Sequence, residues 1–359
     1  MSFQFTRYLY ELEEVKYAFL ISLLNKNQDA LFWAYELQFS GYEKELVDLI
    51  WKIYYDFYAS LNPGFEIYLL NKNTISNFIN DNKYLANIVN NFLIRPYNLD
   101  VFMARQIIKN FEIDFIKEDL KKLLELKDYV NIAFYILEII KDENIIDNIN
   151  IIFNYFHKDK DKHFILWNKV KTYNDPKVIL LSYIFRFYSE IENLKLGKNI
   201  YIVVNDEEIE EYKISITKSE NFPAWKTLGN VNLCAIDESK WLNLFKLKRD
   251  KENIVEFYHY KWLYYASKSP LWASRIAMFN GTINNEKKEI EFQEEDDLQY
   301  FYGIFGYEPD EQPLNIQNKC LEITKDKTRN WENFYKKYRN NGLFIVDNEY
   351  LEEMEKIVY

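Results

Sequence analysis

Apolar residues recur at helical spacing over residues 43–58, directly after a turn at Ser40-Gly41. Two neighbouring stripes with 4-3-4 spacing run along this segment, one formed by Leu46, Ile50, Ile53 and Phe57 and the other by Val47, Trp51, Tyr54 and Tyr58. Together they make a wide apolar face, which needs neighbouring helices on more than one side. With a further helix predicted over residues 28–40, the segment is typical of an αα-hairpin in a stack of helices.

The same periodicity predicts a succession of helices with short polar joins over the first half of the chain, at residues 7–24, 74–94, 98–110, 114–126, 128–141, 144–156 and 175–193. Helix pairs recur about every 35 to 45 residues, the range of HEAT-like arrays. An irregular stack of αα-hairpins fits the pattern equally well. Asn62-Pro63-Gly64 is interpreted as the turn that closes the first three helices. Residues 1–195 are therefore predicted to form an all-helical array.

The pattern changes at Leu196, after which β-rich runs appear between helices. It predicts two hairpins, at 199–216 and 282–293, and a last strand at 343–346. Further helices are predicted near 241–245, 252–266, 270–280, 296–304, 331–339 and from 348 onwards. The sequence thus predicts a mainly α protein in which a smaller α+β domain, residues 196–359, follows the array.

Composition supports a globular, helical chain and restricts its partners. Of 359 residues, 48% are apolar and only 8 are Gly and 7 Pro, which disfavours an all-β architecture. The formal net charge of −11 argues against a surface that is basic throughout and binds nucleic acid along its length. Two cysteines, no apolar run of membrane-spanning length and no signal peptide lead us to expect a soluble, cytoplasmic protein without membrane contact.

The motifs of common catalytic and cofactor sites are missing from the sequence. The three histidines, His157, His163 and His259, lack cysteines or further histidines at zinc-ligand spacing. No glycine-flanked nucleophile, phosphate-binding loop or dinucleotide-binding turn occurs. We therefore expect no metal and no cofactor.

Acidic residues cluster twice in the second half of the chain. Residues 294–297 are four consecutive acids ahead of an apolar helix, where they offset the helix dipole. A second cluster lies in the joint GYEPDEQP and consists of Glu308, Asp310 and Glu311. This joint is interpreted either as a structural turn that begins a helix or as a loop that binds a partner.

Two segments combine basic and aromatic residues against the acidic average. Within the first, residues 240–264, the candidates are Lys246, Lys248, Arg249, Lys251, Tyr258, Tyr260 and Trp262. Within the second, residues 325–339, they are Lys336, Lys337 and Arg339. If both segments converge on one face, they supply phosphate contacts and stacking rings for single-stranded RNA. Solvated helix faces over an aromatic core explain the same residues.

A short motif near the C-terminus points to a protein partner. Tyr338, Leu343 and Phe344 fit the Tyr-x4-Leu-apolar pattern by which scaffold proteins of eukaryotic translation initiation bind the cap-binding protein. With 30 tyrosines in the chain the match arises easily by chance, and Gly342 disfavours the helical form that the motif adopts.

Four segments are distinctive: DALFWAYELQFSG, WKIYYDFYASLNP, KWLYYASKSPLWASRI and FYGIFGYEPDEQP. Together they resemble an uncharacterised protein family of giant viruses, the nucleocytoplasmic large DNA viruses. Because the segments lie in both halves, the resemblance covers most of the chain. It implies a viral protein made in the host cytoplasm or viral factory, and it implies no catalytic residue.

These observations predict a non-catalytic helical scaffold or adaptor of a large DNA virus that binds protein partners. Trp33, Trp51 and Tyr55 are candidates for partner contacts wherever they lie outside the core. The first alternative is an RNA-associated factor, such as a viral translation-initiation or transcription component. The second is an unrecognised enzyme with buried carboxylates near His259 or in the 306–313 joint.

Overall fold

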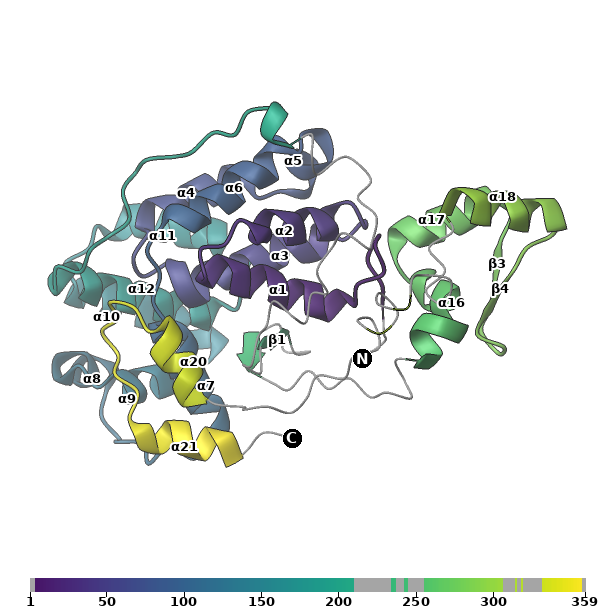
Figure 1. The fold of residues 1–359 in the computed structure, drawn as a ribbon. Coiled ribbons are helices and arrows are strands. Elements are labelled where there is room, and N and C mark those ends of the chain that lie inside the picture. The colour runs from purple at the N-terminus through teal and green to yellow at the C-terminus, as the bar shows by residue number, and fades with distance from the viewer. Residues whose placement is uncertain are drawn as a thin grey trace.

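The structure is a computed structural model, and it describes residues 4–209, 234–236, 242–244, 255–305, 314, 318 and 331–356. The protein is mainly α, with a helical array and a small α+β region (Figure 1). No helix in the described part of the chain combines the length and the apolar character that crossing a membrane requires.

The predicted αα-hairpin is confirmed. It consists of α2 (Asp29–Gln38) and α3 (Glu43–Ile53), which continues as one π-helical turn, Tyr54–Tyr58. The preceding α1 (Leu12–Leu24) packs against α2. Gly41 makes the turn between α2 and α3 with φ of +86°, a conformation that favours glycine. A side chain there would also meet Pro270, since a Cβ atom would lie 2.6 Å from the Pro270 Cβ.

The next helices differ from the prediction in two places. Pro63 does not close the first group but begins α4 (Pro63–Lys72), because proline is well tolerated at the first helical position. The helix predicted over 74–94 is broken into α5 (Ile75–Asn80) and α6 (Lys83–Ile94). Asp81 causes the break, since its carboxylate accepts a hydrogen bond from the Lys83 N–H at 2.9 Å. Helix α7 (Asp100–Asn110) follows.

The array continues through further helices, several of which begin at a capping aspartate. These are α8 (Leu120–Leu126), α9 (Tyr129–Phe134) with a π-helical turn at Tyr135–Ile139, a 3₁₀ turn at Asp142–Asn144, α10 (Ile145–Tyr155), α11 (Lys160–Val170) and α12 (Pro176–Ile191). The start of α8 at Leu120 corrects the predicted start at 114, because Asp119 accepts from the Lys122 N–H at 2.8 Å and caps the helix. The periodicity did not predict α11.

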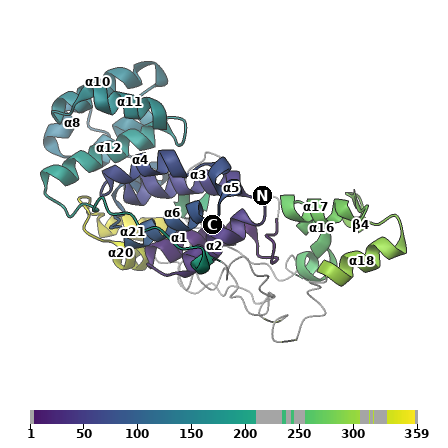
Figure 2. The ribbon, with the colours of Figure 1, turned by 90° about the horizontal axis from the view of Figure 1, so that it is seen from above.

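Two hydrophobic cores divide the described chain differently from the predicted boundary at 195. The main core joins α1–α12 to two C-terminal helices, α20 (Trp331–Tyr338) and α21 (Asn348–Lys356). The second core is built by the π-helical turn Glu256–Tyr260, α16 (Trp262–Ala266), α17 (Pro270–Met278) and α18 (Glu295–Phe305), together with the N-terminal residues Phe5 and Leu9. Figure 2 shows this second unit beside the array, and it shows α20 and α21 packed on the array.

Short antiparallel pairs make up the β structure of the described residues. β3 (Thr282–Asn284) pairs with β4 (Glu289–Glu291) in the register Ile283 to Ile290, which confirms the second predicted hairpin. β1 (Cys234–Ile236) pairs with β2 (Leu242–Leu244). β2 lies where a helix was predicted near residues 241–245, so that prediction is wrong. Residues 198–204 and 343–346 are not strands, which corrects two further predictions, and residues 210–216 lie outside the described chain.

Candidate functional site

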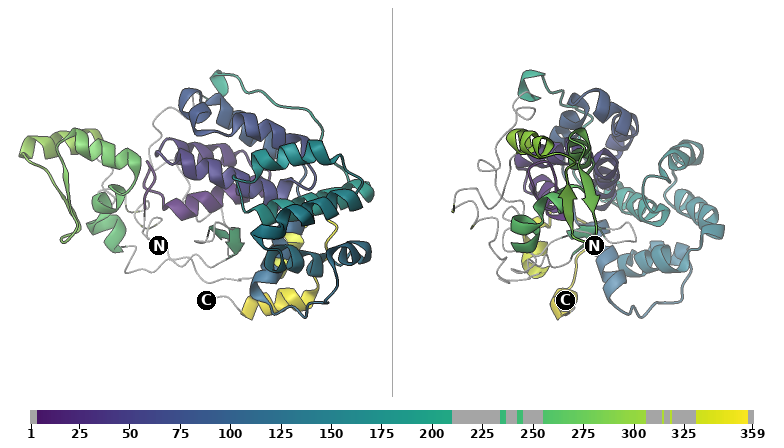
Figure 3. Two further views of the ribbon diagram at one scale, coloured as in Figure 1. Left: turned by 180° about the vertical axis from the view of Figure 1, so that it is seen from behind. Right: turned by 90° about the vertical axis from the view of Figure 1, so that its right-hand side faces the viewer.

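An extended segment, residues 197–204, crosses the outside of the helical array. It begins after α12, where Asn193 turns the chain with φ of +54°, and it passes α4 and α6 (Figure 1). The view from behind also places it at the periphery of the array (Figure 3). We refer to it below as the extended segment.

Asparagine side chains on α6 bind the backbone of this segment. Asn91 makes two hydrogen bonds to one residue: its Nδ2 donates to the Ile202 carbonyl at 3.0 Å, and the Ile202 N–H donates to Asn91 Oδ1 at 3.1 Å. One turn earlier, Asn87 Oδ1 accepts from the Val204 N–H at 2.7 Å. Because residues four apart share a helix face, α6 presents a row of amides that replaces a neighbouring β-strand.

Arg95, at the end of α6, extends this row. Its Nη1 and Nη2 donate to the carbonyls of Lys198 and Ile200, both at 2.9 Å. The guanidinium lies over the rings of Phe65 and Tyr201, 4.4 and 5.1 Å from their centroids. Burial lowers the pKa of Arg95, but an arginine stays charged over the physiological range. The charge therefore strengthens the hydrogen bonds to the segment.

The segment approaches the array most closely at Gly197. The Gly197 N–H donates to the Leu61 carbonyl at 2.7 Å. A Cβ atom at this position would lie 1.9 Å from Asn62 Oδ1, so any other residue would displace the Asn62 side chain, whose Nδ2 donates to the carbonyls of Tyr58 and Pro96. Farther along, the ring of Tyr201 stacks on Tyr68 with 4.7 Å between centroids.

The opposite edge of the segment faces outward. The N–H of Val204, the carbonyl of Ile200 and both backbone groups of Ile202 point to α6, and in extended chain the odd residues then point the other way. In the described part of the chain, the backbone N–H and C=O groups of Tyr201 and Val203 have no hydrogen-bond partner. Val203 is 76% exposed and Ile200 59% exposed. In the described chain the site therefore presents an unpaired edge of extended backbone flanked by apolar side chains, which can serve as a template for an added strand.

Sequence reasoning found this segment but not its partner. The alternation in NIYIVV predicted a strand of a hairpin, whereas the described segment forms no strand and the amides that bind it lie on a helix. The available signal was three polar residues at helical spacing, Asn87, Asn91 and Arg95, which share one face of α6 and its C-terminal end.

Several predicted site residues lie outside the described chain, so their predictions stay untested. These are Lys246, Lys248, Arg249 and Lys251 of the first basic segment and Glu308, Asp310 and Glu311 of the acidic joint. The backbone of Tyr258 lies in the π-helical turn, and its side chain is not described.

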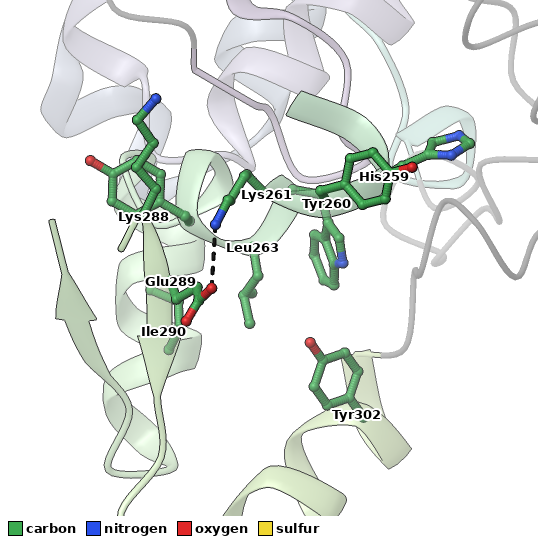
Figure 4. Close-up of a pocket in the computed structure, with 10 residues that line it drawn as sticks. His259, Tyr260, Lys261, Leu263, Lys288, Glu289, Ile290 and Tyr302 are labelled. Carbon is green, nitrogen blue, oxygen red and sulfur yellow. Dashed lines mark hydrogen bonds and ion pairs between the residues drawn. The ribbon is translucent and has the colours of Figure 1, made fainter. Parts of the chain in front are cut away.

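The described end of the first basic segment borders a pocket of about 330 Å³ in the second unit (Figure 4). Tyr260 is 75% exposed at its rim, but Trp262 is 5% exposed and packs edge-on against Trp272, so it offers no stacking face. Lys261 forms an ion pair with Glu289 at 3.3 Å, and Lys288 forms one with Glu256 at 3.2 Å. Figure 4 shows the His259 ring directed away from Lys261 and Tyr302. Because both lysines already have anionic neighbours, the pocket is not a strong anion site.

The described part of the second basic segment, residues 331–339, lies on α20 and just after it, against the main core. The ammonium group of Lys336 pairs with Glu332, that of Lys337 lies 5.0 Å from the ring centre of Tyr338, and the guanidinium of Arg339 lies 5.5 Å from that of Tyr335. The described parts of the two basic segments thus pack on different cores and do not meet.

The residues of the C-terminal partner motif make contacts within the chain itself. Tyr338 is 3% exposed and donates to Asn25 Oδ1 at 3.2 Å. Asp100 accepts from the N–H groups of Leu343 and Phe344 at 2.8 and 3.2 Å, and Phe344 is buried. Asp100 of α7 thus binds the backbone of the motif, while the Tyr338 and Phe344 side chains are buried and unavailable to a partner in this structure.

The other aromatic candidates, Trp33, Trp51 and Tyr55, lie in the main core. Tyr55 donates to Glu66 Oε1 at 2.9 Å, and Tyr183 donates to the same atom at 3.0 Å. Burial raises the pKa of Glu66, which lies deep between helices. Among the described residues, no group of histidine, cysteine and acidic side chains is placed to hold a metal ion.

Comparison with protein-family models, with curated proteins and with solved structures finds no match to this chain.

Proposed function

We propose that this protein is a helical scaffold that binds a protein partner through the outward edge of the extended segment. The partner adds an extended strand to this edge and pairs with the backbone groups of Tyr201 and Val203. In this proposal the chain is a viral protein that acts in the host cytoplasm, as its sequence resemblance implies.

One observation carries the proposal. The row formed by Asn87, Asn91 and Arg95 binds the inner edge of the segment and leaves its outer edge unpaired. Strand edges in soluble proteins are commonly covered, twisted away or protected by charge, because they otherwise recruit another strand. Here the exposed residues of the edge, Ile200, Tyr201 and Val203, are apolar. Such an exposed apolar edge is suited to binding an extended segment of a protein partner.

The RNA-associated alternative has less support from the geometry. It requires the basic and aromatic residues to converge on one face. The described members, Tyr260 on one side and Lys336, Lys337 and Arg339 on the other, belong to the second unit and to the array respectively.

Photocrosslinking tests the proposed function. A benzophenone amino acid replaces Val203 at the edge or, as a control, Ile165, which is 58% exposed on α11. In cells that make the full chain, we expect a defined crosslinked protein at position 203 and none at 165. The identified protein is then purified and titrated against the chain. No crosslink at 203, or the same products at both positions, would contradict the proposal.

A further inference from the structure

We propose that Asn341 is a site of spontaneous deamidation, and that the isoaspartate formed there detaches the following residues from Asp100 of α7. The inference does not depend on the partner proposed for the extended segment. It assigns a chemical modification to the loop between α20 and α21, the two C-terminal helices that pack on the main core.

Deamidation requires that the backbone nitrogen of the next residue reach the asparagine side chain. The Gly342 nitrogen loses its proton to base and bonds to Cγ of Asn341, and the Cγ–Nδ2 bond breaks as ammonia leaves with a proton from water. A five-membered succinimide remains. Water then adds to one of its two carbonyl carbons and opens the ring, which gives aspartate or isoaspartate. Glycine favours this ring closure because it has no side chain to obstruct the attack and its backbone is conformationally permissive.

The sequence contains two Asn-Gly pairs, and the structure distinguishes them. The first, Asn280-Gly281, directly follows α17. The Gly281 N–H donates to the Ile276 carbonyl at 3.0 Å, and Asn280 Nδ2 donates to Asp297 Oδ2 at 3.1 Å. The nitrogen that would attack and the amide that would leave are therefore both held by hydrogen bonds at this site.

The second pair, Asn341-Gly342, lies in irregular backbone after α20, and Asn341 is exposed. The Asn341 backbone N–H donates to Asn340 Oδ1 at 3.1 Å, but among the described residues its side-chain amide has no hydrogen-bond partner. In the same part of the chain, the Gly342 N–H is also unpaired. The reacting atoms can therefore approach each other without first breaking a hydrogen bond.

Isoaspartate at position 341 changes how the residues after it bind α7. The main chain then runs through the former side chain and is longer by one methylene group. Gly342 has no room to absorb the shift, since a Cβ atom there would lie 2.3 Å from Asp100 Oδ1. The N–H groups of Leu343 and Phe344 donate to the same carboxylate at 2.8 and 3.2 Å. The longer chain therefore displaces these donors from their buried acceptor.

The same loop is also bound to α20. The Tyr335 hydroxyl donates to the Phe344 carbonyl at 3.2 Å and accepts from the Val346 N–H at 3.1 Å. A displacement at Asp100 therefore disturbs a second set of contacts that keeps Phe344 buried. We expect the modified loop to open locally more often than the unmodified one.

Peptide mapping by mass spectrometry tests the site. The folded full chain is incubated at mildly alkaline pH, because base promotes the reaction, and the conversion of amide to carboxylate is followed over time. We expect Asn341 to convert at least about tenfold faster than Asn280, because two hydrogen bonds must open before attack at Asn280. Asn341→Gln is the matched control and should not convert, since glutamine closes a six-membered ring far more slowly. Equal rates at the two asparagines, or no conversion at Asn341, would overturn the inference.

Hydrogen exchange of the reacted protein tests the consequence. The deamidated fraction is isolated by its extra negative charge, and its isoaspartate content is measured by enzymatic methylation of the isoaspartyl carboxylate. We expect the amides of Leu343 and Phe344 to exchange at least about tenfold faster in isoaspartate-containing protein than in the unreacted chain.

Asn341→Asp separates the effect of charge from that of chain length, because it carries the added charge without the extra methylene group. We expect exchange at Leu343 and Phe344 in this variant to stay close to that of the unreacted chain. Equal acceleration in Asn341→Asp and in the isoaspartate form would overturn the role of the lengthened chain. Unchanged exchange in the isoaspartate form would overturn the detachment from Asp100.

Discussion

The side-chain amide of Asn91 forms both of its segment contacts with one backbone residue, donating to the Ile202 carbonyl and accepting from the Ile202 N–H. This pair of hydrogen bonds is what an adjacent strand would provide, yet it comes from a helix. It fixes the register of the extended segment, since a shift by one residue would turn the free backbone groups towards α6. The arrangement decides which edge of the segment remains open to a partner.

Hydrogen exchange should follow the alternation of the segment. Amides of Ile202 and Val204 donate to Asn91 and Asn87, whereas those of Tyr201 and Val203 have no partner in the described chain. In dilute protein, we expect slow exchange at 202 and 204 and fast exchange at 201 and 203. Residue-resolved NMR exchange measures this. Uniform exchange along the segment would show that α6 does not hold it in the described register.

Replacing Asn91 with alanine should destabilise the protein by about 1–3 kcal/mol, because the backbone groups of Ile202 lose their partner in a half-buried place. Asn90→Ala is the matched control on the same helix, since Asn90 donates only within the helix, to the Ala86 carbonyl at 3.0 Å. Denaturant unfolding gives both values. A loss for Asn90→Ala as large as that for Asn91→Ala would refute a specific role of Asn91.

Asp100 should make stability depend on pH. Burial raises the pKa of Asp100 from 3.8 to about 6, so the folded state binds a proton more tightly than the unfolded state. Its contribution to the free energy of unfolding therefore falls as the pH rises from about 4 to about 6, by at most about 3 kcal/mol, and then stays constant. Asp100→Asn should lack this component. Parallel pH profiles for the two proteins would contradict the assignment.

The buried ion pair of Arg105 with Asp56 should be far more sensitive than an exposed one. Arg105 Nε and Nη2 donate to the two Asp56 oxygens at 2.9 and 2.5 Å, and both side chains are almost fully buried. Arg105→Met leaves the Asp56 carboxylate buried without its main cation and should cost about 3–5 kcal/mol. Lys336→Met, which removes the exposed pair with Glu332, should change stability by less than about 1 kcal/mol. Thermal and denaturant unfolding of both variants compare the two pairs, and similar losses would be unexpected.

Local patterns in the sequence correctly predicted the elements that local chemistry fixes. The two apolar stripes of residues 43–58 gave a helix, Gly41 the turn before it, and the acids at 295–297 the start of α18. The errors arose where a short polar side chain outweighed the periodicity, as at Asp81 and Asp119. There a cap begins a new helix inside a segment whose apolar pattern continues.

The sequence by itself determined that this chain is mainly helical, because apolar periodicity over ten or more residues is a local property. Only the tertiary structure decided what binds residues 198–204, since Asn91 and Ile202 are 111 positions apart and no local pattern links them. The tertiary structure likewise buried Tyr338 and Phe344 and left Val203 exposed, because burial depends on which helices pack together and not on the residues alone.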